Sequence, residues 1–391
     1  MENFSIPLII RSIKKLLGEG PHFLHEPSMG KKETNYVTET IKNNYVSTKG
    51  IYVQKFEKKI KNYTKANHVT STINGTQAIF IALKALGIKQ NEEVLVPALT
   101  FVGTVNAISY LGAEPHFIDS NIKDFGIDCR KLENYLKKIV IFKKNKSINK
   151  KTGRAIRAII PVHVFGHPCD IEFILRLAKK YKLKIVEDAA ECLGSFYKNK
   201  HLGTFGDFGI LSFNGNKIIT SAGGGAVLVN SKKNFDFISL IGNVAKSNHP
   251  IELYNVDIGY NYKMPNFNAS LGFSQFNKIN KFLKYKKNLN RIYFKRFSKF
   301  NNKLKLIRDL KNTKSNFWLQ GIIVNKISLR NAIIKTCIKN KIFIKPIWKP
   351  LHENKYCKKK YCHKDLSNTK YLAKRLISLP SGFGILKNEK K

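Results

Sequence analysis

The amino-acid sequence predicts an α/β protein in which a mostly parallel sheet is covered by helices on both faces and a smaller α+β domain follows. Two observations carry this prediction. Between residues 69 and 230, short apolar segments alternate with segments of helical periodicity, which is typical of repeated β-α-β units. Beyond residue 230, basic amphipathic segments replace this alternation. Because 391 residues are too many for one small core, we expect a large domain over residues 1–249 and a small domain over residues 250–391.

The elements of the large domain can be placed along the chain by their length and periodicity. The segments with the composition of buried strands are residues 92–97, 113–120, 156–164, 182–188 and 208–213. Helical spacing is found in residues 75–87, 101–112 and 170–181, and Asp170 is placed to cap the last of these helices. Ligands of parallel sheets bind at the carboxyl ends of the strands, so we expect the loops at residues 74–76 and 188–190 to line the site.

The C-terminal part of the sequence predicts different elements. Residues 265–297 form a basic amphipathic stretch that predicts one or two long helices, and residues 315–325 predict a strand. No internal repeat is visible. We therefore expect a separate, smaller packing unit after residue 250.

Composition limits the function classes that need to be considered. The first twenty residues contain a short apolar patch without a long apolar core and cleavage site, and no stretch approaches about eighteen uninterrupted apolar residues. We expect a soluble, cytoplasmic protein that does not bind membranes. Of the six cysteines, only Cys357 and Cys362 lie close together, beside His363, and no second pair completes a tetrahedral set, so we expect no metal.

The formal net charge of +44 invites a nucleic-acid-binding interpretation, to which we give little weight for this sequence. Lysine, asparagine, isoleucine and phenylalanine are enriched together, as an AT-rich coding sequence would produce, and the lysines are spread along the chain. Such runs are more often solvated faces than binding grooves. The charge still has a consequence, because its field attracts anionic substrates.

Lys217 is the first candidate for chemistry. It lies in the stretch LSFNGNKIITSAGGGAVLVN, residues 211–230, between two apolar runs and shortly before the three glycines 223–225. Apolar flanks suggest a lysine near the floor of a pocket, where desolvation favours the neutral, nucleophilic amine. The glycines let the backbone turn sharply behind the lysine and pack closely, where a Cβ atom would intrude.

Four further features surround this lysine in the expected crevice. Asp188 ends a buried strand, where its carboxylate can pair with a protonated ring nitrogen; a helix cap or an ion pair is the structural alternative. Gly75 and Thr76 open a helix whose free N–H groups suit a phosphate, and the Ser212 hydroxyl can reach the same phosphate. Phe101 opens the next helix, where it can stack on a flat ring or simply pack in the core.

A lysine amine, a carboxylate for a pyridinium nitrogen, a phosphate-binding helix start and a stacking aromatic together describe a site for pyridoxal 5'-phosphate (PLP). This cofactor is held by a Schiff base to a lysine. The sequence therefore predicts a PLP-dependent enzyme.

Longer stretches of the sequence resemble the DegT/DnrJ-type sugar aminotransferases, over roughly residues 35 to 380. Within that family the chain is most similar to the branch that acts on 4-keto-6-deoxy-HexNAc nucleotides in bacillosamine and legionaminic acid pathways. The stretches that carry the resemblance are residues 74–88, 96–120, 158–225 and 259–272.

The resemblance implies roles for individual residues. The family's Schiff-base lysine falls on Lys217, its pyridinium partner on Asp188 and its stacking aromatic on Phe101. Its phosphate ligands fall on Gly75, Thr76 and Ser212. Asn261 matches an asparagine that family members extend to the cofactor phosphate of the neighbouring subunit, which implies a homodimer with shared active sites.

The resemblance also implies a fold and a reaction. The fold is the aspartate-aminotransferase-like, type I PLP-dependent transferase fold, with a three-layer αβα large domain. The reaction is a transamination in which an amino donor, L-glutamate, supplies the 4-amino group of a UDP- or GDP-linked 6-deoxy sugar for surface glycan or nonulosonic acid biosynthesis. His163 and Glu191 are candidates for contacting the sugar, with a structural hydrogen-bonding role as the alternative for each.

Some positions depart from the family pattern, and other functions remain as alternatives. Members of this branch tend to carry glutamine, arginine and histidine where this chain has Asn268, Lys263 and Lys349. We also expect the small domain to lack the family's usual last helix. One alternative is a PLP-dependent sugar dehydratase, which the lysine at position 217 argues against because those members carry histidine there. The other is a non-catalytic regulatory or nucleic-acid-binding protein of the same fold.

Overall fold

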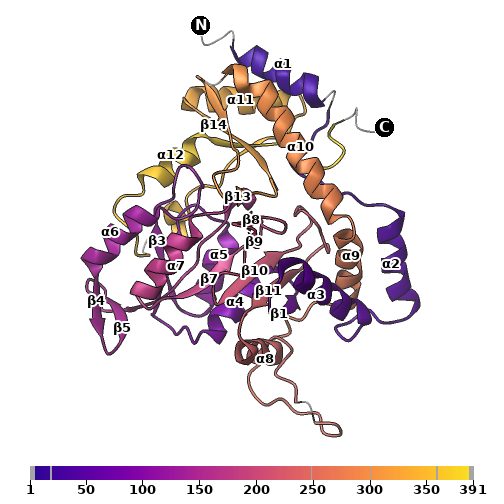
Figure 1. Ribbon diagram of the computed structural model, residues 1–391, viewed down its shortest axis with the longest axis vertical. Coiled ribbons are helices and arrows are strands. Elements are labelled where there is room, and N and C mark those ends of the chain that lie inside the picture. Colours follow the sequence, from indigo (N-terminus) through magenta and orange to yellow (C-terminus); the bar gives the residue numbers. More distant parts are fainter. Residues whose placement is uncertain (1–4, 18–19, 248, 301, 358–359, 387–391) are drawn as a thin grey trace.

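A nine-stranded sheet forms the centre of the large domain in the computed structural model of the chain (Figure 1), which describes residues 5–17, 20–247, 249–300, 302–357 and 360–386. Seven strands lie in the order β1-β11-β10-β7-β6-β2-β3, and the hairpin of β4 and β5 joins through β6. The strands are β1 (His68–Thr72), β2 (Glu93–Pro97), β3 (Glu114–Ile118), β4 (Val140–Lys143), β5 (Lys146–Asn149), β6 (Ala155–Ile159), β7 (Lys184–Asp188), β10 (Phe208–Ser212) and β11 (Gly225–Val229).

Most of this sheet is parallel, as predicted. The pairs β10–β7, β7–β6, β6–β2 and β2–β3 are parallel. Strand β11 runs antiparallel to both β1 and β10, so β1 runs in the same direction as β10. The carboxyl ends of β1, β7 and β10 consequently meet at one edge of the sheet.

Helices cover both faces of the sheet, because the side chains of each strand alternate between two apolar cores. In β2, Val94 and Val96 pack in one core with α4 and α5, whereas Leu95 packs in the other with α6 and α7. These helices are α4 (Gly75–Ala85), α5 (Val102–Tyr110), α6 (Cys129–Ile139) and α7 (Ile171–Lys180). The three-layer prediction is confirmed, and Asp170 caps α7 by accepting a hydrogen bond from Phe173 N at 3.2 Å.

The C-terminal part contains a second, four-stranded sheet in the order β12-β14-β16-β15, with short edge strands. Its strands are β12 (Leu304–Leu306), β14 (Gln320–Val324), β15 (Lys345–Pro346) and β16 (Leu376–Leu379), and its helices are α11 (Ile327–Lys339) and α12 (Ser367–Arg375). The predicted stretch 265–297 forms two helices, α9 (Asn266–Phe276) and α10 (Ile279–Phe297). Strand β14 begins only at Gln320, because the backbone turns through a positive φ of 49° at Phe317.

The N-terminal segment joins both parts of the molecule. Helix α1 (Ser5–Leu17) buries Ile9, Ile13 and Leu17 against α10 and α11, so it contributes to the core of the C-terminal part. The sequence-based division placed this segment in the large domain. Helices α2 (Lys31–Lys42) and α3 (Ile51–Thr64) pack instead against α9.

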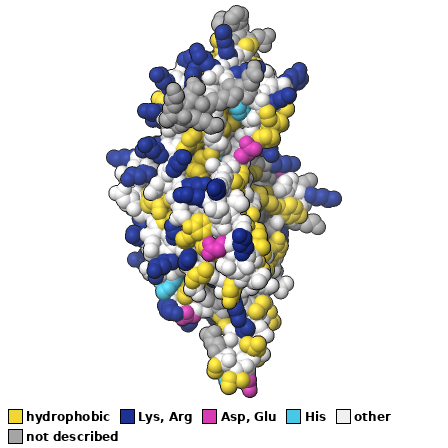
Figure 2. Space-filling view, turned by 90° about the vertical axis from the view of Figure 1, so that its right-hand side faces the viewer, with side chains coloured by type: hydrophobic (Ala, Val, Ile, Leu, Met, Phe, Trp, Pro, Cys, Tyr) yellow, Lys and Arg dark blue, Asp and Glu magenta, His cyan; other side chains and the backbone are white. Residues whose placement is uncertain are grey.

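Two features of the surface bear on function. Lysine and arginine side chains are scattered over the face shown in Figure 2 and are not gathered in one groove. Below α8 (Lys232–Ile241) in Figure 1, residues 243–247 and 249–262 belong to a loop that projects from the large domain. Across the part of the chain that the structure describes, no helix combines the length and the apolarity needed to span a bilayer.

Candidate active site

The candidate site lies at the edge of the large sheet where β1, β7 and β10 end. Gly75 follows β1 at the start of α4, Asp188 is the last residue of β7, and Ser212 is the last residue of β10. The topology therefore brings together residues that are up to 137 positions apart in the sequence. This is the ligand-binding edge expected for a parallel sheet.

Lys217 lies in the segment between β10 and β11 and is partly buried. Its Nζ atom is 3.3 Å from Glu191 Oε1 and 3.9 Å from the centroid of the Trp318 ring. The indole Nε1 of Trp318 donates a 2.6 Å hydrogen bond to Asn216 O, which fixes the ring beside the lysine. Since its side chain is 14% exposed, the amine is both held in place and accessible.

The backbone around Lys217 differs in one respect from the expectation. The residue with positive φ in this turn is Ala222 (φ 65°), not one of the three glycines. The glycines instead allow close packing: a Cβ atom on Gly225 would lie 2.6 Å from the carbonyl carbon of Asn74. A bare backbone at Gly225 therefore lets β11 touch the start of α4.

Asp188 is buried and held by two hydrogen bonds. Its Oδ2 accepts a 2.6 Å bond from the Thr104 hydroxyl, and its Oδ1 accepts a 3.2 Å bond from Ala190 N. Thr104 lies in α5 and also contacts the Thr100 hydroxyl at 3.1 Å. These bonds fix the orientation of a carboxylate at the edge of the crevice.

The start of α4 is the position at which the sequence predicts an anion site. Asn74 caps the helix by accepting a 2.9 Å hydrogen bond from Gln77 N. The N–H groups of Gly75 and Thr76 have no intrahelical acceptor, because they lie in the first turn. Gly75 lies against Ser212, because a Cβ atom on Gly75 would be 3.3 Å from Ser212 Cβ. The three predicted phosphate ligands are therefore adjacent.

Phe101 immediately precedes α5 and is 56% exposed, which is unusual for a phenylalanine beside a core. A Cβ atom on Gly103 would approach both the Thr76 hydroxyl and the Phe101 ring, the latter at 3.2 Å. The exposed ring thus lies next to the anion site, where a flat ligand ring can stack on it.

These residues fit PLP. The cofactor needs an amine for its aldehyde, a carboxylate for its ring nitrogen, a helix start for its phosphate and an aromatic face for its ring. Lys217, Asp188, the first turn of α4 and Phe101 supply these four groups at one edge of the sheet. The glycine at position 75 keeps the helix start open for the phosphate.

The two sugar-contacting candidates have different surroundings. His163 is fully buried, and both ring nitrogens are engaged: Nε2 is 3.3 Å from Glu187 Oε2, and Nδ1 accepts a 3.2 Å bond from Cys169 N. These contacts favour the structural alternative for His163. Glu191 contacts Lys217 and also accepts a 2.7 Å bond from Phe165 N. Burial raises the pKa of Glu191, although the nearby Lys217 ammonium opposes this shift.

Asn261 and Lys263 lie at the end of the projecting loop, Asn268 lies in α9, and the third departing position, Lys349, lies in the C-terminal part after β15. The backbone of Asn261 pairs with Asn243, and its side chain is exposed. Lys263 Nζ forms a 2.5 Å ion pair with Glu57. Asn268 Nδ2 donates hydrogen bonds to the carbonyl oxygens of Ser221 and Gly223, at 2.8 and 3.1 Å, and so supports the turn that follows Lys217.

Two residues of this site were missed from the sequence. Thr104 carried a usable signal, because it lies three residues after Phe101 in the same predicted helix and therefore on the same side of it. Trp318 carried none, because it lies 101 residues after Lys217 and reaches the site only when the two parts of the molecule pack together.

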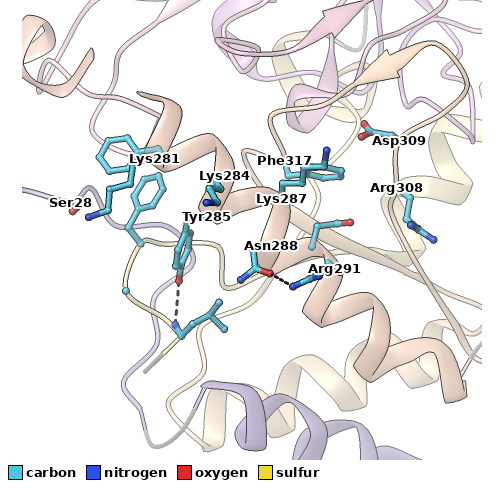
Figure 3. Close-up of a pocket in the computed structure, with 15 residues that line it drawn as sticks. Ser28, Lys281, Lys284, Tyr285, Lys287, Asn288, Arg291, Arg308, Asp309 and Phe317 are labelled. Carbon is cyan, nitrogen blue, oxygen red and sulfur yellow. Dashed lines mark hydrogen bonds between the residues drawn. The ribbon is translucent and has the colours of Figure 1, made fainter. Parts of the chain in front are cut away.

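A cavity of about 1390 Å³ lies along α10 (Figure 3). Basic side chains from α10 and from the segment after β12 line this cavity: Lys281, Lys284, Lys287, Arg291 and Arg308. Three aromatic side chains lie beside them: Tyr285, Phe317 and Phe383. None of the predicted site residues lines it. Phe317, which lines this cavity, precedes Trp318 in the chain.

Comparison with known proteins agrees with this geometry. Residues 27–390 match the profile of the DegT/DnrJ/EryC1/StrS aminotransferase family. The chain is 35% identical to GDP-perosamine synthase of Escherichia coli O157:H7 over 94% of each chain. It is 29% identical to UDP-4-amino-4,6-dideoxy-N-acetyl-beta-L-altrosamine transaminase of Campylobacter jejuni over 90% of each chain. In three dimensions it is similar to Spr1654 of Streptococcus pneumoniae in its PLP-form, with a TM-score of 0.80, 22% identity and coverage of 91% and 92% of the two chains.

Proposed function

The chain belongs to the DegT/DnrJ/EryC1/StrS aminotransferase family, whose cofactor is PLP, and we propose that it aminates the C4 keto group of a nucleotide-linked 6-deoxy sugar. L-Glutamate is the proposed amino donor. The names of two relatives support this substrate class, because one refers to a GDP-linked amino sugar and the other to a UDP-linked 4-amino-4,6-dideoxy sugar. The amino sugar would serve surface glycan or nonulosonic acid biosynthesis.

The position of Lys217 is the observation that carries this proposal. Its amine lies at the carboxyl edge of the parallel sheet, 3.3 Å from a buried glutamate and above an indole ring, on the same edge as Asp188 and the start of α4. An amine, a buried carboxylate and an anion-binding helix start together suit a PLP-dependent reaction at a carbonyl carbon.

The cofactor supplies an aldehyde that carries the amino group and a ring that withdraws electrons from the reacting carbon. Lys217 would hold that aldehyde, and Gly75, Thr76 and Ser212 would bind the phosphate. Asp188 would hold the proton on the ring nitrogen, since the hydrogen bonds from Thr104 and Ala190 N keep its carboxylate in one orientation.

Lys217 would also act as the acid and base on the two substrates. Its Nζ atom would remove the proton from the α-carbon of glutamate and later deliver a proton to C4 of the sugar. Glu191 would stabilise the ammonium form of this lysine from 3.3 Å. Of the two sugar-contacting candidates, Glu191 therefore acts beside the reacting atoms, whereas His163 supports the fold.

A homodimer with shared active sites belongs to the same proposal. The projecting loop exposes large apolar side chains in a row that is unusual for a free surface: Ile251 at 85%, Leu253 at 75%, Val256 at 51% and Ile258 at 80%. Yellow side chains are visible at the corresponding lower tip of Figure 2. A second copy of the chain would cover them and bring the exposed Asn261 to the partner's cofactor phosphate.

A substrate panel tests the proposed function. The protein, loaded with PLP, would be incubated with L-glutamate and UDP- or GDP-linked 4-keto-6-deoxy sugars, with and without an N-acetyl group, and the products analysed by mass spectrometry. Formation of an amino sugar from at least one substrate, with 2-oxoglutarate in equal amount, is the expected result. A protein that binds PLP and aminates none of them would contradict the proposed substrate class.

A further inference from the structure

His25 lies in the segment between α1 and α2, which crosses from the small domain to the large domain. The segment is fixed to the end of β16, because Ser381 N donates a 2.7 Å hydrogen bond to Leu24 O. The His25 ring packs between two aromatic rings, with centroid distances of 6.4 Å to Trp318 and 5.7 Å to Phe383. The Trp318 ring therefore contacts both the His25 ring and the amine of Lys217.

The imidazole of His25 has no hydrogen-bond partner among the described residues, although its side chain is more than nine-tenths buried. Both Nδ1 and Nε2 are buried and unpaired. Three other buried histidines behave differently: His116 uses its two nitrogens for Glu93 and Tyr135, and His163 and His201 also use both. A buried, unpaired polar group is costly and rare, and it indicates a missing ligand or water.

The charges around His25 define the chemistry that it can recognise. Burial and the nearby amines of Lys286 and Lys217 hold the pKa of His25 well below its usual range, so the ring is neutral. A neutral imidazole offers one N–H donor and one acceptor nitrogen. Hydroxyl and amide groups, which also donate and accept, are its natural partners.

Binding of PLP does not account for the two unpaired nitrogens of His25. The groups that fit PLP lie on the large-domain side of Lys217, at the ends of β1 and β7. His25 lies with Trp318, Phe383 and the buried Lys286, whose Nζ donates to Trp318 O at 2.9 Å. A group that hydrogen-bonds to His25 would therefore lie on the side of Trp318 and Phe383.

We propose that His25 is a specificity-determining residue that hydrogen-bonds to a hydroxyl or acetamido group on the sugar ring of the nucleotide-linked substrate. This inference rests on the proposed function and deepens it. The N-terminal segment thereby supplies one wall of the sugar subsite, opposite the cofactor.

The test compares the sugar nucleotide with its nucleoside diphosphate alone. Both would be titrated into the PLP-loaded protein by calorimetry, using the 4-amino sugar nucleotide that the wild-type protein produces. His25→Leu should weaken binding of the sugar nucleotide by about tenfold, the scale of one lost hydrogen bond, and leave binding of the nucleoside diphosphate unchanged. His25→Gln, which keeps a donor and an acceptor, should restore part of the affinity.

A matched control is available at His167, which is also buried and has one unpaired nitrogen but contacts Phe125 and Phe317. His167→Leu should change neither affinity. If His25→Leu lowered the affinity for both ligands equally, or for neither, the inference would be wrong. The proposed function would be unaffected by that result. A wild-type protein that aminates no nucleotide-linked keto sugar would overturn both.

Stability and kinetics provide two independent readouts. Because His25→Leu removes buried, unpaired atoms, the unliganded variant should unfold at or above the wild-type temperature. A clear decrease would show that the ring is a structural group and would contradict the proposal. In single-turnover measurements the glutamate half-reaction should be unchanged, and KM for the keto sugar should rise about tenfold; a slower glutamate half-reaction would also contradict it.

Discussion

The Thr104 hydroxyl donates a 2.6 Å hydrogen bond to Asp188 Oδ2, and both side chains are buried. Thr104→Val keeps the shape of the side chain but leaves that carboxylate oxygen unpaired. We expect kcat to fall about tenfold, since the orientation of Asp188 loses one of its two supports. Thr104→Ser keeps the hydroxyl and should retain most of the activity. Equal losses in the two variants would point to packing and not to the hydrogen bond.

Asp188 itself should matter more. Asp188→Asn keeps the size of the side chain but removes the negative charge that holds a proton on the cofactor ring. We expect kcat to fall at least about a hundredfold, the scale of comparable electrostatic deletions, while the protein still binds part of its PLP. Absorbance spectroscopy measures the bound cofactor and a coupled assay measures turnover. Near-normal turnover would show that another group pairs with the ring nitrogen.

Lys217 should be the point of covalent attachment. Reduction of the PLP-loaded protein with borohydride should fix the cofactor mass on the peptide that contains Lys217, as measured by mass spectrometry. Lys217→Ala should abolish amino transfer, because it removes the only amine that this site places beside Glu191 in the described structure. The exposed Lys232 provides a control, since Lys232→Ala should remain active. A label on a different lysine would refute the assignment.

Asn261 should serve the active site of the partner subunit. In a heterodimer of Lys217→Ala and Asn261→Ala subunits, one site then carries both lesions and the other carries neither. After subunit exchange, which light-scattering or mass-tagged subunits can verify, activity should rise above the mean of the two parent variants. Activity equal to that mean, with exchange verified, would mean that Asn261 acts in its own subunit.

Asp124 should make stability depend on pH. Burial raises the pKa of Asp124 to about 7, and the carboxylates of Asp170 and Asp128 add to this shift. A raised native pKa stabilises the fold at low pH, and this contribution is lost as the pH rises through about 7. Relative to the wild type, Asp124→Asn should therefore gain at least about 1 kcal/mol of unfolding free energy between pH 4 and pH 8, measured by urea denaturation. The exposed Asp236→Asn should show no such gain.

The strands and helices of the large domain could be predicted because they alternate along the chain. The buried strands and the helices between them have different periods, so apolar spacing alone separates β7 from α7, and the Asp170 cap marks where α7 begins. The family resemblance rested on the same region. The division between the domains was less readable, because nothing in the first seventeen residues indicates that α1 packs beside α10 and α11.

The candidate site was predictable to the extent that its residues follow strands. Asp188 and Ser212 end β7 and β10, and Gly75 and Lys217 follow β1 and β10, so topology alone brings these positions together. The different roles of His163 and Glu191 could not be predicted from their positions near strand ends, because such a position does not determine the direction of the side chain. The His163 ring contacts the Glu187 carboxylate and accepts a hydrogen bond from Cys169 N, whereas the Glu191 carboxylate contacts the Lys217 amine.

The sequence by itself determined the parallel sheet, the edge at which a ligand binds and the residue types that suit PLP, because local periodicity and chain order are enough to place them. Only the tertiary structure decided what lies above Lys217. Trp318 precedes β14 and contacts the lysine, whereas Phe383 follows β16 and His25 lies in the N-terminal segment. His25 packs against both rings, so these contacts join elements far apart in the chain. Such contacts depend on packing between distant segments, which no local pattern encodes.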